Sequence, residues 1–461
     1  MIELRVWLDR DPVGVLSHDG ATNRFSFVYT QAWRDRPRSF PIAPRLPLQR
    51  PATQTDEAHS AEVRQFFENL LPEGEALDHA AQANGISKSN LIGLVMALGK
   101  ETSGAIRVTP IGAGDHLADH RDDGRRDAGD HDGGDQDLRL VTHEELSERI
   151  KARARIPFSV WDGKVRLSIA GYQDKVAIYE RDDQWYLVEG PRLASTAIVK
   201  PVPTRPQLAS LPANEYTCMQ LAQRVGLDVP KTRLVHVPEP VLLVSRFDRF
   251  EDTERVNRLH LIDGCQALGL SVSMKYERPY GDGEEVKHIR DGATYAKLFK
   301  LLDLSDRPAR DKQMLLRWVI FQVLIGNSDA HGKNVSFFCD VGGVRLAPTY
   351  DLVCMPALGY DQLKDTYAMA IGDAFTQSEL SPFEWASFAH ECGLPIRMVS
   401  QEVRRLSLRV QDSLSDVMED VRVAGVPEEV TRRVIAVIDA NCQRWVAGAP
   451  EVAKLREEDV R

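Results

Sequence analysis

The sequence holds few cysteines, lacks a long apolar run and carries no net positive charge. Its six cysteines are scattered without C-x-x-C spacing, which predicts reduced core residues in a cytosolic protein. No apolar run approaches the roughly 18 residues needed to span a bilayer, and the charged start MIELRVWLDRD lacks a signal-peptide core. The net charge of −10 argues weakly against nucleic-acid binding by the whole chain, although a local basic patch is compatible with it. We therefore predict a cytoplasmic globular protein.

The first 110 residues predict a small α+β unit, the N-terminal unit. Apolar and polar residues alternate over 1–9, which predicts a half-buried strand, and FSFVY (25–29) predicts a second strand. Helical patterns follow over 61–74 and 89–100, and a strand pattern returns at 103–110.

Residues 112–137 have a different composition, with nine Asp, six Gly and almost no apolar residues. Burial cannot offset the ordering entropy of such a stretch, so we predict a flexible linker over 111–138. Its three histidines among aspartates leave metal binding as the alternative, which the composition favours less.

The remaining chain predicts two lobes. The capping-box spacing of Thr142 and Glu145 predicts a helix start, strand patterns dominate from about 160 to 245, and helical patterns dominate from about 290 onwards. We therefore predict an α+β, bilobed fold with a β-rich lobe at 139–250, an all-α lobe at 251–461, and a cleft between them.

A glycine turn between two strands is the first candidate for chemistry. In RLSIAGYQDKVAIYE (166–180) the turn allows the backbone to approach a ligand closely, and Lys175 lies where the chain re-enters the sheet. The motif is not a Walker A loop, because the helix and the G-K-[ST] signature are absent. As an isolated hairpin it has a structural role more often than a functional one.

Lys200 and Glu215 form the second candidate. Lys200 closes an alternating strand, where it is either a solvated edge charge or a phosphate clamp. Residues 212–230 predict a helix with Asn214 as its N-cap and Glu215 in its first turn. Glu215 is either favoured there by the helix dipole or placed to hold Lys200. Further on, the apolar strand 241–244 leads from one lobe towards the next. A backbone there can bond a planar ligand such as adenine, although the spacing alone is a weak signal for this.

A long apolar helix pattern over 311–327 is predicted to stop at Gly326-Asn327. The stretch LIGNSDAHGKN (324–334), which spans this helix end, is the third candidate. Asp329 and Asn334 have the D-x-x-x-x-N spacing of a protein-kinase catalytic loop. Two short strands are expected after it, VSFF (335–338) and VRLAPTYD (344–351), and Asp351 ends the second. Two carboxylates and an amide suit phosphoryl transfer, with one Asp as base and the other two side chains on Mg²⁺. A helix cap rich in Asx residues, or a metal site using Asp329 and His331, is the alternative.

The order of these parts resembles the HipA-type serine/threonine kinase toxins of bacterial toxin–antitoxin pairs. The resemblance covers the chain outside the Asp/Gly-rich stretch. It rests on SIAGYQDKVA, NEYTCMQLAQRVGLDVP, VSRFDR, GCQALGL, KYE, LIGNSDAHGKN and APTYDL, together with RLPLQR and FFENLLPEG in the N-terminal unit. It implies a protein-kinase-like fold that phosphorylates protein serine or threonine.

The resemblance also implies roles by position. Asp329 would be the catalytic base, and Asn334 and Asp351 would hold Mg²⁺. ATP would contact the phosphate-covering loop, a clamp lysine, the hinge and the catalytic-loop region, namely Ala170, Gly171, Tyr172, Gln173, Asp174, Lys175, Lys200, Ser245, Arg246, Phe247, Gln266, His331, Gly332, Lys333 and Tyr350.

The chain departs from the family pattern at two places, and the resemblance implies regulation at a third. Ser245 stands where the family often has Glu, and Tyr172-Gln173-Asp174 replaces the commoner Ala-Gln-Glu. Ser168 aligns with a serine that family members autophosphorylate. A phosphate there is expected to pull the loop out of the ATP site and so to mark an inactive form.

The resemblance implies partners as well. These are a helix-turn-helix antitoxin that contacts operator DNA, and a protein substrate of the aminoacyl-tRNA synthetase class, of which glutamyl-tRNA synthetase is the type. The consequence would be stalled translation and dormancy. The alternatives are a small-molecule or lipid kinase of the same fold, a pseudokinase co-repressor, and a metal hydrolase.

Overall fold

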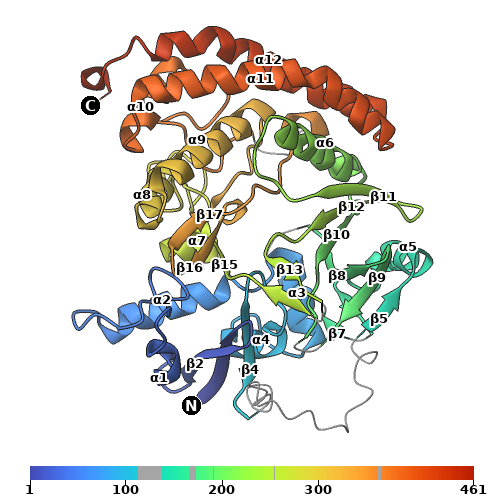
Figure 1. Ribbon diagram of the computed structural model, residues 1–461, viewed down its shortest axis with the longest axis vertical. Helices are drawn as coiled ribbons and strands as arrows, with labels where there is room; N and C mark the ends of the chain where they lie inside the picture. The colour runs from blue at the N-terminus through green and yellow to red at the C-terminus, as the bar shows by residue number, and fades with distance from the viewer. Residues whose placement is uncertain are drawn as a thin grey trace.

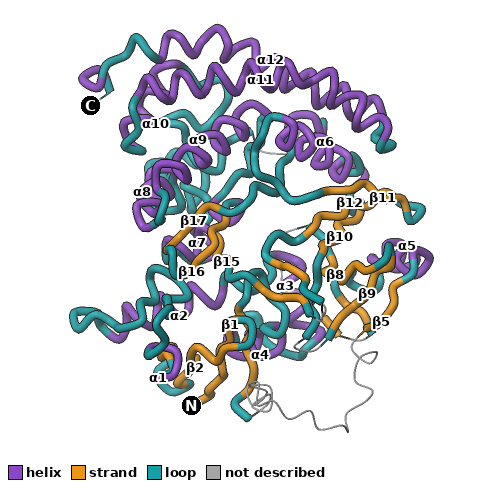
Figure 2. Tube along the Cα trace, viewed as in Figure 1, coloured by secondary structure: helices purple, strands orange, loops and turns teal. Residues whose placement is uncertain are grey.

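The computed structural model describes residues 1–112, 138–162, 164–165, 173–189, 192–253, 255–360 and 365–460. The chain runs from the N-terminal unit at the bottom of Figure 1, through a β-rich lobe at the right, to a helical lobe at the top. Figure 2 shows the same separation by secondary structure, and the expected bilobed α+β fold is confirmed. Within the described residues, no helix combines the length and the apolar character needed to cross a bilayer.

The N-terminal unit is a four-stranded antiparallel sheet, in the order β3-β2-β1-β4, with helices packed on it. The predicted strands and helices are all present, with shifted ends. Residues 113–137, most of the predicted linker, lie outside the described residues. The elements are β1 (Ile2–Leu8), β2 (Asp11–Asp19), β3 (Arg24–Tyr29), β4 (Ile106–Pro110), α1 (Gln31–Arg34), α2 (Asp56–Glu68), α3 (Gly74–Ala83) and α4 (Leu91–Leu98).

The β-rich lobe is built on a six-stranded antiparallel sheet in the order β11-β12-β10-β8-β9-β5. Two short hairpins, β6–β7 and β13–β14, accompany it. The elements are β5 (Leu138–Val141), α5 (His143–Lys151), β6 (Val160–Trp161), β7 (Lys164–Val165), β8 (Val176–Arg181), β9 (Gln184–Val188), β10 (Ala197–Pro201), α6 (Leu211–Arg224), β11 (Thr232–His236), β12 (Pro240–Ser245), β13 (Arg249–Glu251) and β14 (Val256–Arg258).

Helix α6 begins earlier than the sequence predicted. Ser210 precedes the helix and Pro212 lies in its first turn, a position that suits proline because its missing N–H is not needed there. Asn214 is therefore not the N-cap. Its buried side chain bonds the backbone of Cys354, accepting from the N–H at 2.8 Å and donating to the carbonyl at 2.9 Å. It ties α6 to the second lobe.

The helical lobe, expected to be all-α, also carries a three-stranded sheet, β15-β16-β17. Two of these strands correspond to the strand patterns read after LIGNSDAHGKN. The long helix α9 ends where predicted, because Gly326 adopts the left-handed conformation, with φ of 70°. The elements are β15 (Leu261–Asp263), α7 (Gly264–Leu268), α8 (Tyr295–Leu301), α9 (Pro308–Ile325), β16 (Ser336–Asp340), β17 (Gly343–Leu346), α10 (Pro382–Glu391), α11 (Ile396–Val423) and α12 (Glu428–Val452).

The apolar core joins the N-terminal unit to the helical lobe. One continuous cluster of buried side chains runs from the N-terminal sheet through α6 and α9 to α11 and α12. The six-stranded sheet has a separate core, formed with α5. All six cysteines are buried free thiols, as predicted.

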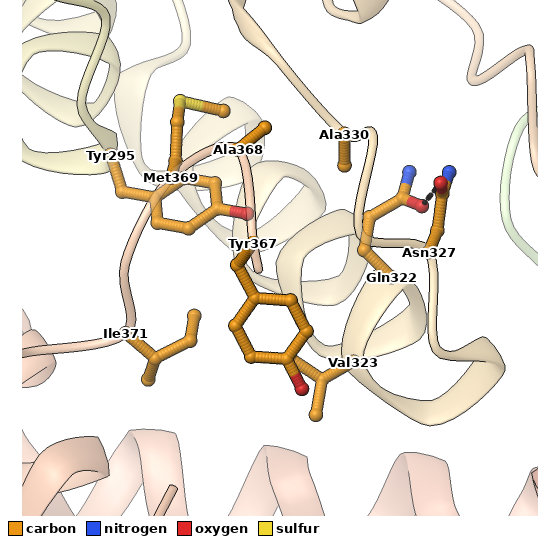
Figure 3. Close-up of a pocket in the computed structure, with 9 residues that line it drawn as sticks. All are labelled: Tyr295, Gln322, Val323, Asn327, Ala330, Tyr367, Ala368, Met369 and Ile371. Carbon is orange, nitrogen blue, oxygen red and sulfur yellow. Dashed lines mark hydrogen bonds between the residues drawn. The ribbon is translucent and has the colours of Figure 1, made fainter. Parts of the chain in front are cut away.

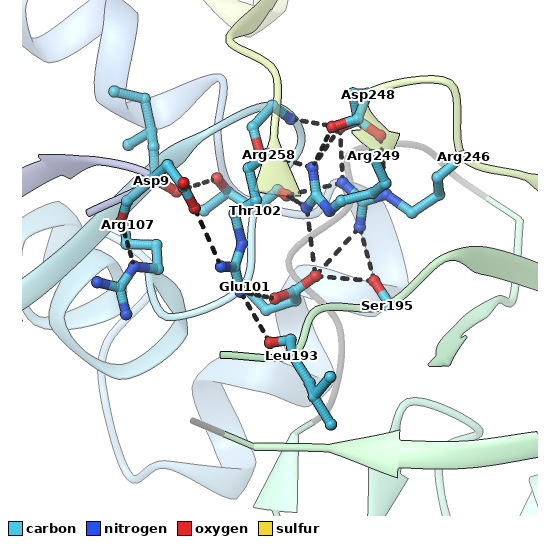
Figure 4. A network of polar contacts seen from close by, with 12 residues as sticks. Asp9, Glu101, Thr102, Arg107, Leu193, Ser195, Arg246, Asp248, Arg249 and Arg258 are labelled. Carbon is cyan, nitrogen blue, oxygen red and sulfur yellow. Dashed lines mark hydrogen bonds and ion pairs between the residues drawn. The ribbon is translucent and has the colours of Figure 1, made fainter. Parts of the chain in front are cut away.

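A buried network of charges joins the N-terminal unit to the β-rich lobe (Figure 4). Glu101 accepts from Arg246 and Arg249 at 3.3 Å and from Arg258 at 3.1 Å. Asp248 accepts from Arg246 at 2.7 Å and from Arg249 at 2.9 Å. Burial alone would raise the pKa of Glu101, but the three guanidinium groups outweigh it and lower this pKa to about 2. The network therefore requires an ionised Glu101.

We predict that Glu101→Gln lowers the free energy of unfolding at neutral pH by about 3–5 kcal/mol, because three buried guanidinium groups then exceed the charge of the remaining carboxylates. The depressed pKa of Glu101 stabilises the fold above about pH 4.5, and this contribution is lost as the pH falls towards 2. The difference between wild type and variant should therefore shrink on acidification. Urea unfolding at several pH values measures it.

The matched control for this change is Asp78→Asn. Asp78 pairs with Lys88, and both side chains are more than half exposed. This substitution should leave the urea midpoint unchanged. Equal effects of the two variants would contradict a structural role for the Glu101 network.

Candidate active site

The side-chain amide of Asn327 ties the start of the loop after α9 to its surroundings. The Asn327 side chain donates to Gln322 Oε1 at 2.9 Å and to the Asp351 carbonyl at 3.3 Å, and it accepts from the Asp329 N–H at 3.2 Å. Figure 3 shows the bond to Gln322, beside a small cavity beneath the loop. The cavity measures about 10 Å³, close to the room that one water molecule needs. It is too small for a nucleotide.

Asp329 presents its carboxylate to solvent while protein packs closely around it. One carboxylate oxygen accepts from the Tyr276 hydroxyl at 2.8 Å. The Asn334 amide donates to the Asp329 carbonyl at 2.9 Å, which ties the two predicted residues together. Desolvation raises the pKa of Asp329, and the Tyr276 bond acts in the opposite direction. A raised pKa makes this carboxylate a stronger base than an ordinary Asp.

Lys200 lies between two carboxylates. Its ammonium donates to Glu215 of α6 at 2.7 Å and to Asp351 at 2.6 Å. Burial alone would lower the pKa of Lys200, but the two carboxylates outweigh it and raise this pKa. Of the two readings of Glu215, the one in which it holds Lys200 is confirmed. The cluster joins the sheet, α6 and the second lobe at one point.

The prediction that Asp351 ends a strand is wrong. β17 stops at Leu346, before Pro348, which has no N–H to donate to a sheet. Asp351 instead lies in a loop, with a left-handed φ of 60° that non-glycine residues seldom adopt. Burial would raise the pKa of its carboxyl, but Lys200 outweighs this effect and the pKa is lowered to about 2. The strained backbone places an ionised carboxylate against Lys200.

The donor set fits a magnesium ion. The Asn334 amide nitrogen is used by the Asp329 carbonyl, so the amide oxygen is the atom left for a ligand. One oxygen of Asp351 is bonded to Lys200, which leaves the second as a further donor. Amide and carboxylate oxygens suit Mg²⁺. Nowhere in the described residues do three His, Cys, Asp or Glu side chains gather as metal ligands.

The phosphate-covering loop is described only at its end. Ser168, Ala170, Gly171 and Tyr172 lie outside the described residues, as does most of the predicted hairpin turn. The described part contains three predicted residues. Asp174 pairs with Arg153 at 3.3 Å, Gln173 is half-buried, and Lys175 is buried directly before β8.

Lys175 belongs to the same cluster of charges as Lys200. Burial and then the Lys200 ammonium lower the pKa of Lys175 to about 8, while Asp351 and Glu73 act in the opposite direction. A second lysine close to Lys200 increases the positive charge that faces a bound phosphate.

The side chains of the predicted hinge residues make different kinds of contact. The Arg246 side chain is buried in the Glu101 network. The backbone N–H of Arg246 donates to the Thr196 carbonyl at 2.8 Å. The Phe247 ring instead lies 5.8 Å from the Tyr350 ring, with the planes 31° apart. Ser245 is the last residue of β12. Phe247 and Tyr350 thus offer an aromatic surface beside the cluster.

Two other predicted residues are engaged with the N-terminal unit. The Lys333 ammonium binds Asn69 Oδ1 at 2.9 Å and also bonds Asp263. Gln266 completes a capping box with Asp263 and donates to the Phe66 carbonyl at 3.2 Å. Both side chains therefore hold the catalytic loop and α7 against α2.

His331 and Gly332 are fixed by close packing. Burial lowers the pKa of His331 to about 3, so its ring is neutral at physiological pH. Its Nδ1 is buried without a partner among the described residues. A Cβ on Gly332 would lie 2.7 Å from the Ala293 methyl group, so this position requires glycine.

The sequence reading assigned no role to four residues that reach this site. Tyr276 binds Asp329, and Lys275 pairs with Glu73 at 2.6 Å, while Asn69 binds Lys333. All four belong to the quoted motifs KYE and FFENLLPEG. The two motifs marked these residues as belonging to the family pattern. Neither motif by itself showed that the two segments contact each other.

Comparisons with known proteins agree with this arrangement. A family model described as the HipA-like C-terminal domain matches residues 167–414, and one described as the HipA N-terminal domain matches residues 4–109. The chain is 36% identical over 449 residues to the serine/threonine-protein kinase toxin HipA of Shewanella oneidensis, with 95% of each chain covered.

A solved structure of Shewanella oneidensis HipA, in complex with HipB and its operator DNA, is 33% identical in sequence. It superimposes with a TM-score of 0.83, covering 98% of this chain and 100% of that chain. The match extends over both lobes and the N-terminal unit, so the fold is that of a bilobed kinase. The chain belongs to the HipA family of serine/threonine-protein kinases.

Proposed function

We propose that the protein transfers the γ-phosphoryl group of ATP to a serine or threonine hydroxyl of another protein, with Mg²⁺ as cofactor. The observation that carries the proposal is the bonding of Lys200 to both Glu215 and Asp351, next to the loop that presents Asp329 and Asn334. Kinases use such a lysine and glutamate to place the phosphates, and such an aspartate and asparagine to place the metal.

In the proposed reaction Asp329 accepts the proton of the acceptor hydroxyl. The hydroxyl oxygen forms a bond to the γ-phosphorus as the bond from that phosphorus to the bridging oxygen breaks, and its electron pair leaves with ADP. Asn334 and Asp351 would hold Mg²⁺, which would supply positive charge to neutralise the phosphates. Lys200 and Lys175 bind the phosphates, and the raised pKa of Asp329 favours proton uptake.

The nucleotide is proposed to lie across the aromatic surface, the hinge and the catalytic loop. Phe247 and Tyr350 face its planar base, and backbone groups near Ser245 bind the base edge. The end of the phosphate-covering loop, with Gln173 and Asp174, lies over the phosphates. This site is supported, through the contacts described above, by Lys333, Gln266, Gly332 and Arg246. The buried His331 borders the site.

We propose that a helix-turn-helix antitoxin related to HipB binds the protein, and that operator DNA is contacted mainly through this partner. The structural relative in complex with HipB and its operator DNA supports this assignment. The net charge of −10 also suits DNA contact through a partner better than direct contact.

The proposed target is an aminoacyl-tRNA synthetase of the glutamyl type, in the cytoplasm. Phosphorylation of such an enzyme would stall translation and arrest growth, which agrees with the description of the Shewanella relative as a toxin.

We predict that the phosphatase-treated protein, incubated with Mg²⁺ and γ-labelled ATP, transfers label to itself and to added glutamyl-tRNA synthetase. Asp329→Asn should lower both rates about 10²–10⁴-fold, because the proton acceptor is lost. Quantitative mass spectrometry of phosphoserine and phosphothreonine measures the transfer.

Asp303→Asn is the matched control, since Asp303 lies on the surface of the same lobe and pairs with Lys312. It should retain the wild-type rate. Equal labelling by wild type and Asp329→Asn would contradict the role of Asp329, and label on the chain without label on the synthetase would contradict only the proposed target.

We propose that phosphorylation of Ser168 inactivates the protein. The residue lies outside the described residues, and the proposal rests on its position seven residues before Lys175. A dianionic phosphate there would pull the phosphate-covering loop out of the ATP site through charge repulsion and new hydrogen bonds. Ser168→Glu should weaken ATP binding about tenfold or more in a calorimetric titration, whereas Ser168→Ala should bind normally. Unchanged affinity in Ser168→Glu would refute this regulation.

A further inference from the structure

The N-terminal unit reaches the catalytic loop through Glu73. This residue lies between α2 and α3 and is nearly buried, at 9% exposure. Its carboxylate pairs with Lys275 at 2.6 Å, and the two side chains are 10% and 15% exposed. A buried pair of this kind is fixed in position, unlike a solvated surface pair.

The backbone of Lys275 and the side chain of its neighbour Tyr276 both bond the catalytic loop. Its carbonyl accepts from the Gly332 N–H at 2.9 Å. The next residue, Tyr276, bonds the Asp329 carboxylate, and the Lys275 ammonium lies 5.3 Å from the centre of the Tyr276 ring. The charge of Lys275 is close enough to lower the pKa of both Asp329 and His331. Lys275 therefore places a positive charge beside the proposed base.

Glu73 also has an unused oxygen. Oε2 binds Lys275, whereas Oε1 is buried and has no hydrogen-bond partner among the described residues. Its charge acts on Lys175 as well as on Asp329. A buried carboxylate oxygen without a partner costs free energy. A catalytic role is one of the reasons for which such an oxygen is kept.

The lysines of the site differ in how fully they are engaged. Lys200 bonds two carboxylates, and Lys333 bonds Asn69 and Asp263. The Lys275 ammonium has three N–H donors, and in the described part of the chain Glu73 takes one of them. Lys275 therefore retains donors for a ligand next to Asp329.

We propose that Lys275 is a catalytic cation that binds the transferring phosphoryl group on the acceptor side, and that Glu73 of the N-terminal unit is the residue that positions it. This inference rests on the proposed kinase function and adds the N-terminal unit to the active site. Lys275 keeps its proton throughout. The bond to the acceptor oxygen forms, the bond to ADP breaks and Asp329 takes the hydroxyl proton, while the ammonium offsets negative charge between the phosphoryl oxygens and Asp329.

The test measures kcat for ADP formation from Mg²⁺–ATP, which counts transfer to any acceptor, together with KM for ATP. Lys275→Met should lower kcat about 100-fold and change KM less than about threefold, because the interaction is made in the transition state. Lys275→Arg should recover kcat to within about tenfold of wild type. Glu73→Gln should lower kcat about tenfold, since Lys275 remains but is no longer held.

The double variant Glu73→Gln/Lys275→Met separates positioning from a structural role. If Glu73 acts through Lys275, the double variant has the same kcat as Lys275→Met alone. It also removes both members of the buried pair, so it folds without an unpaired charge. Lys88→Met, which breaks the exposed pair with Asp78, is the control and should behave as wild type.

Three results would overturn the inference. These are wild-type kcat in Lys275→Met, an equal loss in Lys275→Met and Lys275→Arg, and additive losses in the double variant. The proposed function fails in a different way. In that case wild type forms no ADP, or Asp329→Asn forms it as fast as wild type. Wild-type turnover that needs Asp329 and is indifferent to Lys275 overturns this inference alone.

Discussion

The pairing of Lys200 with Glu215 and Asp351 is the interaction on which the rest of the site depends. Lys200 comes from the six-stranded sheet, Glu215 from α6, and Asp351 from the loop after β17. The buried charges of Lys200 and Glu215 are tolerable only with their partners in place. The lobes are therefore held at a fixed separation at the point where ATP phosphates are proposed to bind. The left-handed backbone of Asp351 is part of the same constraint, since it directs the carboxylate towards Lys200.

A second set of contacts explains why the N-terminal unit belongs to the enzyme rather than being attached to it. Its apolar core continues into the helical lobe, and Glu101 gathers three arginines from the segment that leaves the hinge. Asn69 binds Lys333 of the catalytic loop, and Glu73 binds Lys275. The unit thus contacts both the hinge and the catalytic loop. A shift of the unit would therefore change contacts at both places.

The sequence predicted the parts formed by local pattern. The apolar period and Gly326 gave the end of α9, and the order of Lys200, Glu215, Asp329 and Asn334 gave the kinase-like site. The sequence did not predict contacts that join distant residues. Lys333 and Asn69 are 264 positions apart, and no periodicity connects them. The left-handed backbone of Asp351 was not predicted, because an alternating pattern of apolar residues carries no information about the dihedral angles of the loop after the strand. Asn214 was assigned to a cap because buried and capping asparagines look alike in one sequence.

A crystal structure with Mg²⁺ and a non-hydrolysable ATP analogue would test the central claim most directly. The account predicts that Lys200 keeps its bond to Glu215 and contacts the phosphates. It also predicts that the metal is bound by the Asn334 amide oxygen and the Asp351 carboxylate, with the γ-phosphate facing Asp329. A nucleotide bound with its phosphates and metal away from Asn334 and Asp351 would contradict it.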